Sequence, residues 1–139
     1  MGMRKNLASV AAVGVLAITA TTFSTTTAAA DPNYYPCPAN SFCLYYNSNQ
    51  QGAMWYTTSA EPNLDGYLFL YTGNGNGAYK PVKNNAASFK NNMDVQGRVW
   101  YSSGYRGVYD SFGSVGSTRM VGNLVNTYNE NASISMGGF

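Results

Sequence analysis

The sequence predicts an all-β domain made of two Greek-key halves that pack on one another. The chain has 139 residues with 12 tyrosines, 16 asparagines and 15 glycines. Tyrosine favours strands, whereas asparagine and glycine favour turns. Short aromatic and β-branched runs alternate with turn-rich pieces, and no stretch has an apolar period long enough for a packed helix. Several of these features also occur twice along the chain.

Seven short runs have the residue types of strands. They are residues 42–46, 53–57, 67–71, 98–101, 108–112, 120–125 and 132–136. Turn-rich pieces such as NSNQQG, TGNGNG and SSGYRG lie between them. Strands of this length and spacing predict a sandwich or a barrel.

Two segments repeat in the same order in the two halves. Leu44–Gly52 aligns with Val99–Gly107, because each has a hydrophobic residue, two aromatics, a five-residue polar hairpin and a glycine. Asn84–Ser88 is then echoed by Asn129–Ser133. Neither half could bury its inner face alone, so we expect two packed Greek keys. Their bounds are roughly residues 37–90 and 95–137.

The first 30 residues have the features of a secretory signal peptide. Two basic residues at 4–5 precede an apolar run over residues 7–20, and an A-x-A signal-peptidase site ends at Ala30. The apolar run is shorter than the about 20 residues that span a bilayer. We therefore expect a secreted, extracellular protein in which residues 31–139 form a single domain.

Charge and residue types exclude several classes of function. Residues 31–139 hold six basic and six acidic side chains, so we expect no binding to nucleic acid or to an anionic membrane. The chain has no histidine, which removes Ser-His and Cys-His nucleophile pairs and histidine-ligated zinc. No motif singles out a pair of carboxylates for glycoside hydrolysis. The sequence therefore predicts a monomeric binding protein that has no catalytic residues.

The cysteine spacing favours a structural disulfide. Cys37 and Cys43 are the only cysteines, and five residues lie between them. In an exported chain such a pair is expected to be oxidised, and it lacks the two-residue spacing of a redox pair. Closing so short a loop stabilises the fold by about 2 kcal/mol.

The order of the motifs resembles peptidase inhibitor family thirty-six, a family of small secreted bacterial proteins typified by a metalloproteinase inhibitor. The shared pattern runs from Cys37 to about Ser135 as CPxxxxC, LYYNSNxxG, NNAAS, VWYSSGYRG and YNxNAS. The resemblance implies a βγ-crystallin-like fold and inhibition of a secreted peptidase, with a zinc metalloendopeptidase as the expected partner. The type member has a second disulfide beside its reactive loop, whereas this chain has no cysteine after Cys43.

An inhibitor of this kind is expected to hold an extended, substrate-like loop on a rigid scaffold, so that little entropy is lost on binding. The stretch from Gly113 to Arg119 lies between second-half strands and is followed by the hydrophobic residues Met120 and Val121. Thermolysin-like peptidases favour such residues after the cut. The candidate residues are Ser117, Thr118, Arg119, Met120 and Val121. Thr72–Ala78 has three glycines, which predicts a flexible tip and a poorer inhibitory loop. For both stretches an ordinary surface loop is the alternative.

The Asn/Ser segments indicate calcium as an alternative ligand. Microbial βγ-crystallins bind calcium through a segment of the form Asp/Asn-Asp/Asn-x-x-Ser/Thr-Ser in each Greek key. The candidate ligands are Asn84, Asn85, Ser88, Asn129, Glu130 and Ser133. Calcium prefers six to eight oxygens, usually with carboxylates among them, and the first segment has none. A serine followed by an apolar residue equally predicts a turn that enters a buried strand, and inhibition itself needs no cofactor.

Carbohydrate binding is the other alternative. Exposed tyrosine and tryptophan rings on strands stack on sugars, and asparagine side chains between them bind hydroxyls. The tyrosines serve a Greek-key core equally well, because alternation places about half of the aromatics of each strand inside.

Overall fold

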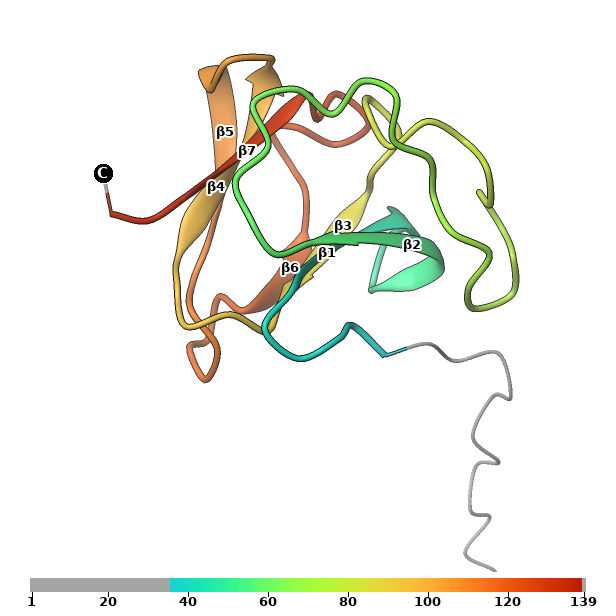
Figure 1. Cartoon of the computed structure of the whole chain (residues 1–139), viewed down its shortest axis with the longest axis horizontal. Coiled ribbons are helices and arrows are strands. Elements are labelled where there is room, and N and C mark those ends of the chain that lie inside the picture. Colours follow the sequence, from blue (N-terminus) through green and yellow to red (C-terminus); the bar gives the residue numbers. More distant parts are fainter. Residues whose placement is uncertain (1–35, 139) are drawn as a thin grey trace, which may run out of the picture.

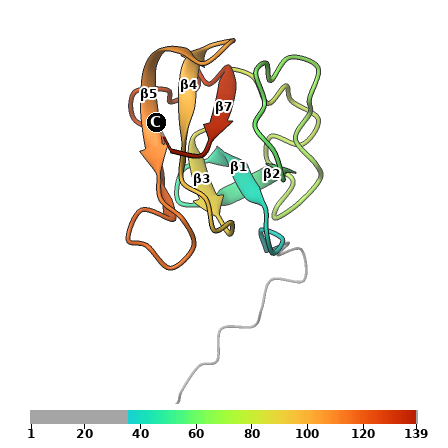
Figure 2. The same cartoon turned by 60° about the vertical axis from the view of Figure 1, so that its left-hand side comes forward.

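The computed structural model describes residues 36–138, which form seven strands and no helix. The strands are β1 (Phe42–Asn47), β2 (Gln51–Thr57), β3 (Ser88–Asn91), β4 (Gly97–Ser102), β5 (Arg106–Phe112), β6 (Val121–Asn123) and β7 (Ser133–Met136). They form two antiparallel sheets in the orders β2-β1-β3-β6 and β5-β4-β7 (Figures 1 and 2). The predicted all-β fold class is confirmed.

Each half contributes backbone to the sheet of the other half. Strand β6 of the second half pairs with β3 of the first half, with Ser88 opposite Asn123. In the equivalent place, Glu61 of the first half forms an antiparallel bridge with Ile134 of β7. Two hydrogen bonds of 2.8 Å join the Glu61 and Ile134 backbones. The halves are therefore interlocked, which goes beyond the predicted packing of one half on the other.

The two repeated hairpins have the same backbone geometry. In the β1–β2 hairpin Asn49, Gln50 and Gly52 have positive φ angles, and in the β4–β5 hairpin the positive angles fall at Gly104, Tyr105 and Gly107. These positions match residue for residue in the sequence repeat. The repeat is therefore a repeat of backbone conformation, and the glycine that closes each hairpin occupies a region of φ that side chains disfavour.

The strand predictions succeeded at five of the seven runs and differed at the others. Residues 120–125 contain only the short strand β6, and β3, which directly follows the first Asn/Ala turn, was not among the predicted runs. Residues 67–71 do not form a regular strand. Their backbone instead pairs irregularly with residues 79–82, through bonds of 2.9 Å such as that from Val82 N to Tyr67 O.

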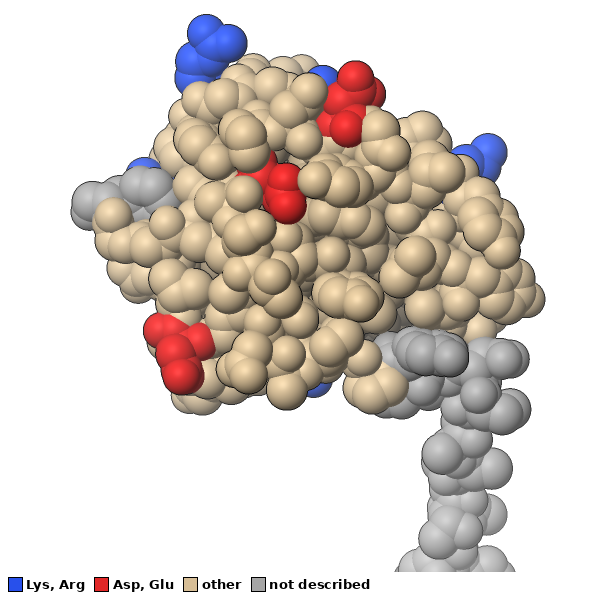
Figure 3. Space-filling model, in the orientation of Figure 1, with Lys and Arg blue, Asp and Glu red and all other residues tan. Residues whose placement is uncertain are grey.

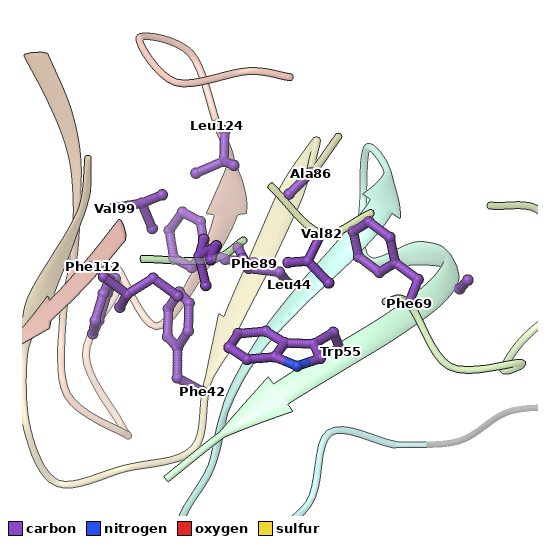
Figure 4. Packing of buried hydrophobic residues seen from close by; sticks show 13 residues of the cluster. Phe42, Leu44, Trp55, Phe69, Val82, Ala86, Phe89, Val99, Phe112 and Leu124 are labelled. Atoms are coloured by element: carbon purple, nitrogen blue, oxygen red, sulfur yellow. The ribbon is translucent and has the colours of Figure 1, made fainter. Parts of the chain in front are cut away.

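The core lies between the two sheets and is centred on three phenylalanines. Phe42 of β1 lies 4.2 Å from Phe112 of β5 and 6.0 Å from Phe89 of β3, measured between ring centroids. Figure 4 shows these rings together with Val99, Leu124 and the other buried apolar side chains. Full burial of one phenylalanine contributes roughly 1.5–3 kcal/mol, so this cluster is a main source of stability.

A smaller cluster lies on the side of the first sheet that faces away from the core. It contains Tyr45, Met54 and the bonded pair Cys37–Cys43, which confirms the predicted disulfide. Within residues 36–138, no helix is long and apolar enough to cross a membrane. Charged side chains are scattered singly over the face drawn in Figure 3, in agreement with the balanced charge of the sequence.

Candidate functional site

The loop between β5 and β6 is a compact double turn. The Ser117 amide donates to the Ser114 carbonyl at 3.1 Å, and the Met120 amide donates to the Ser117 carbonyl at 3.3 Å. Gly116 has a φ of +81°, which suits the third position of a type II turn. The expected extended, substrate-like shape of residues 113–120 is therefore wrong, because the chain curls back on itself within these residues.

The two ends of this loop are held together by Asn91, the last residue of β3. Its side chain is fully buried, and Nδ2 donates to the Gly113 and Val95 carbonyls, both at 2.8 Å. The backbone amide of Asn91 donates to the Met120 carbonyl at 2.7 Å. One buried asparagine thus binds the start and the end of the loop, so the loop is closed at its base without a second disulfide.

The candidate residues of the loop divide between its tip and its base. Thr118 and Arg119 are exposed, whereas Ser117 and Met120 are half-buried. Val121 is exposed but belongs to β6, where it pairs with Lys90. Its backbone is therefore part of the sheet and not of the projecting tip.

Sequence reasoning missed Val115, which is 42% exposed and the apolar side chain at the tip. Its backbone amide donates to the Met93 carbonyl at 2.8 Å, so the residue is fixed even though its side chain projects. The signal that could have found it is the Val-Gly pair inside GSVGS, because this pair occupies the middle of a type II turn.

Ser117 has an unusual environment within the loop. Its Oγ is the one buried side-chain oxygen or nitrogen in residues 36–138 that has no hydrogen-bond partner. An unpaired buried hydroxyl costs about 1–3 kcal/mol of desolvation. Ser117 therefore does not stabilise the free loop through its hydroxyl.

The glycine-rich loop of the first half is packed against the β1–β2 hairpin. Gly77 lies so close to Tyr46 that a Cβ on it would be 2.0 Å from Cγ of the ring, and a Cβ on Gly73 would be 2.9 Å from the Gly52 carbonyl oxygen. The Asn76 carbonyl also accepts a 2.8 Å hydrogen bond from the Ala53 amide. The glycines of residues 72–78 thus permit close approach of the backbone to the hairpin, and the flexible tip that their composition predicts is not observed.

The repeated serines of the Asn/Ser segments stabilise the hairpins. Ser88 Oγ donates to the Asn47 carbonyl at 2.6 Å and accepts from the Gln50 amide at 2.9 Å. Ser133 Oγ makes the equivalent bonds in the second half, at 2.7 and 3.1 Å. Both serines are fully buried. Each is therefore a hydrogen-bonding clamp beneath the hairpin of its own half.

The remaining candidate calcium ligands lie at the surface. Asn84 and Asn129 are exposed with positive φ, and each donates its backbone amide across to the other half, to Asn131 and Ala86 respectively. Glu130 is exposed, and the Asn85 side chain donates to the Lys83 carbonyl.

Carboxylates do not gather near these segments. The Asp110 carboxylate accepts from the backbone amides of residues 125–127 and from the Thr127 hydroxyl. Within residues 36–138, no three His, Cys, Asp or Glu side chains come together as metal ligands. Calcium binding stays a prediction.

Comparison with known proteins identifies the family. The family model described as Peptidase inhibitor family I36 matches residues 30–112, more than half of the chain. This chain belongs to peptidase inhibitor family I36. No curated protein matches the sequence. The part matched by the I36 model ends at the last residue of β5, so the role of the loop at 113–120 rests on its geometry.

Solved βγ-crystallin structures resemble the fold. One, from work on the evolution of the eye lens βγ-crystallin domain fold, has 13% identity and a TM-score of 0.54, and the match covers 76% of this chain and 93% of that one. A double mutant of a βγ-crystallin domain from Clostridium beijerinckii has 13% identity and a TM-score of 0.48, with 70% and 96% covered. The first likeness shows that this I36 member has the βγ-crystallin fold that its motifs implied.

Proposed function

We propose that this protein inhibits a secreted zinc metalloendopeptidase by inserting the tip of the loop at residues 113–120 into the active-site cleft. The observation that carries the proposal is the closed, projecting double turn fixed by Asn91, in a chain that belongs to a peptidase inhibitor family. The inhibitor supplies no chemistry of its own. It acts by occupying the cleft.

The physical basis is preorganisation. A loop whose ends are already held in place loses little conformational entropy when it is bound, so more of the contact energy appears as affinity. Val115 offers an apolar side chain at the tip, and Thr118 and Arg119 offer polar contacts beside it. If a peptidase cuts the tip, Asn91 keeps the new ends together, which favours slow release and resealing of the bond.

The same proposal includes the location of the protein. A signal peptide over residues 1–30, which lies outside the described residues, would export the chain to the compartment of its target. Residues 31–139 would then act as a single monomeric domain in the extracellular space.

The test is a titration of purified residues 31–139 against a thermolysin-like metalloendopeptidase and a subtilisin-like serine peptidase. We expect loss of metalloendopeptidase activity near one equivalent and no effect on the serine peptidase. Mass spectrometry would then locate any slowly cleaved bond between Val115 and Met120. Inhibition of neither enzyme, or rapid digestion of the folded protein, would contradict the proposal.

Loop variants locate the contact. Val115→Asp places a charge at the tip, and we expect it to weaken inhibition at least about tenfold, which corresponds to about 1.4 kcal/mol. The matched control is Asn74→Asp in the glycine-rich loop, which keeps the oxygen that accepts from the Asn76 amide. If the control weakened inhibition and the tip variant did not, the first-half loop would be the contact.

A further inference from the structure

The outer side of the first sheet has a groove with a volume of about 620 Å³. It is lined by the tip of the β1–β2 hairpin, by residues 72–74 and by side chains of the sheet itself. Tyr45 in its lining also belongs to the cluster on the side away from the core. The volume falls in the range of about 300–1,000 Å³ that is typical of ligand sites.

Neutral amides dominate the polar lining of the groove. They are the side chains of Asn49, Gln50, Gln51 and Asn74, and the lining also includes Thr72 and Lys90. None of the described residues that line it is acidic, and Lys90 is its one charged residue. A primary amide presents a donor and an acceptor side by side, which matches a pair of neighbouring hydroxyl groups.

Three of these amides are held in place before any ligand binds. Gln50 Nε2 donates to the Gly122 carbonyl at 3.1 Å, and Asn49 Oδ1 accepts from Asn123 Nδ2 at 3.1 Å. Asn74 Oδ1 accepts from the Asn76 amide at 3.0 Å. Each bond uses one polar atom of the amide and leaves the other available. The polar rim is therefore preorganised, which lowers the entropy lost on binding.

Apolar side chains outside the groove lining lie on the same side of the sheet. Met54 pairs with Tyr45 in β1 and with Leu70. Because side chains alternate along a strand, Tyr56 lies on the same face, two residues further along β2. Tyr56 and Leu70 are 43% and 45% exposed. Tyr56 is not part of the groove lining, so its ring can stack on the C–H face of a sugar unit that extends beyond the groove while the amides bind the hydroxyls of another unit.

We propose that this groove binds an uncharged polysaccharide, with the amides of Gln51 and Asn74 as hydrogen-bond partners. Tyr56, on the same face of the sheet but outside the groove lining, is the stacking platform for the part of the chain that extends beyond the groove. In Figures 1 and 2 residues 72–74, which line the groove, belong to the yellow-green part of the chain, and residues 113–120 form the orange loop on the opposite side. Val121, the residue after this loop, also lines the groove, but its backbone belongs to β6 and not to the tip of the loop. The proposed sugar contacts are therefore separate from the tip that we propose enters the peptidase. It would hold the protein on extracellular glycans.

The test is calorimetric titration of residues 31–139 with cellohexaose, chitohexaose and xylohexaose, and with polygalacturonate as a charged comparator. We expect binding to at least one neutral oligosaccharide with a Kd below about 1 mM, unchanged by added salt. Gln51→Ala and Tyr56→Ala should each weaken it at least about tenfold. The exposed residues Gln96 and Tyr128 provide the matched controls Gln96→Ala and Tyr128→Ala, which should bind like the parent protein.

Three results would overturn the proposal. They are absence of binding to all three neutral probes, binding to polygalacturonate alone with loss in salt, and binding that Gln51→Ala and Tyr56→Ala leave unchanged. Thermal melts of both groove variants check that they fold. Peptidase inhibition by Gln51→Ala should match the parent, so a failure of this proposal is distinguishable from a failure of the inhibitory function.

Discussion

The connections that follow the two hairpins begin at equivalent points of the fold and are built differently. The first is ten residues longer between its matching glycine and asparagine, from 52 to 84 against 107 to 129. The extra length forms an irregular hairpin whose glycine-rich tip packs onto Tyr46 and β2. The shorter connection leaves a double turn that projects and is held at its base by Asn91. In one scaffold, the first loop is therefore packed against the sheet and the second projects from it.

The largest expected effect is a difference in stability between glycine-to-alanine variants of the two loops. Gly77→Ala should destabilise the fold by about 3 kcal/mol, because its Cβ would overlap Tyr46 at a φ of +86°. Gly116→Ala has a φ of +81° but no atom within 4 Å of the added Cβ, so we expect only about 1 kcal/mol of backbone strain. Urea unfolding measures both values. Equal values would show that the first loop is not packed as described.

The closure of the second loop depends on Asn91. Asn91→Ala should cost about 2 kcal/mol, since the carbonyls of Gly113 and Val95 lose a buried donor. Proteolysis of the folded variant should become faster within residues 113–120. Asn85→Ala, which removes one bond to the Lys83 carbonyl, is the control and should leave that rate unchanged. An Asn91 variant with an equally resistant loop would contradict the role of this clamp.

The disulfide stabilises the first half and should not affect the presented loop. Replacing Cys37 and Cys43 together by serine should lower the free energy of unfolding by about 2 kcal/mol. The bond lies in the outer cluster with Tyr45 and Met54, so peptidase inhibition by the folded variant should be unchanged. Unfolding curves and inhibition titrations at the same temperature test both statements. If inhibition fell in proportion to stability, the loop at 113–120 would depend on the disulfide, which would contradict this prediction.

Equivalent substitutions at the two repeated serines should destabilise the fold by the same amount. Ser88→Ala and Ser133→Ala each remove one hydroxyl that bonds a carbonyl and an amide of its hairpin, so each should cost about 1.5 kcal/mol. Chemical denaturation of the two variants gives the comparison. If the two losses in free energy of unfolding differ by more than about 1 kcal/mol, the repeated serines do not contribute equally to stability.

The smallest effect is expected inside the double turn. Ser117→Ala removes a buried hydroxyl without a partner, so the free energy of unfolding should not fall and should increase by up to about 1 kcal/mol. Thermal melts suffice to measure it. A loss of more than about 1 kcal/mol would mean that the hydroxyl has a partner in solution.

Much of the scaffold could be predicted because its signals are local. Strands β1, β2, β4, β5 and β7 have aromatic or β-branched residues next to turn residues, and the disulfide follows from two cysteines in a short span. Strand β3 has only four residues, of which one is aromatic and none is β-branched, so its pattern is weak. Its place in the sheet depends on pairing with β1 and β6, which are distant in sequence.

The candidate site was predicted less completely, for a similar reason. The loop at 113–120 was found from its place between strands and its hydrophobic end. Its curled shape and the exposure of Val115 depend on Asn91, and nothing in the sequence distinguishes this asparagine from the other 15. The glycines of residues 72–78 indicated flexibility by composition, and only the position of Tyr46 shows that they allow close packing.

Hydrogen–deuterium exchange of residues 31–139, alone and with an equimolar inactive thermolysin-like metalloendopeptidase, tests the central claim most directly. The account predicts slower exchange in residues 113–120 on mixing and unchanged exchange in residues 72–78. Protection of residues 72–78 alone, or no protection anywhere, would contradict the proposal that the loop held by Asn91 contacts the peptidase.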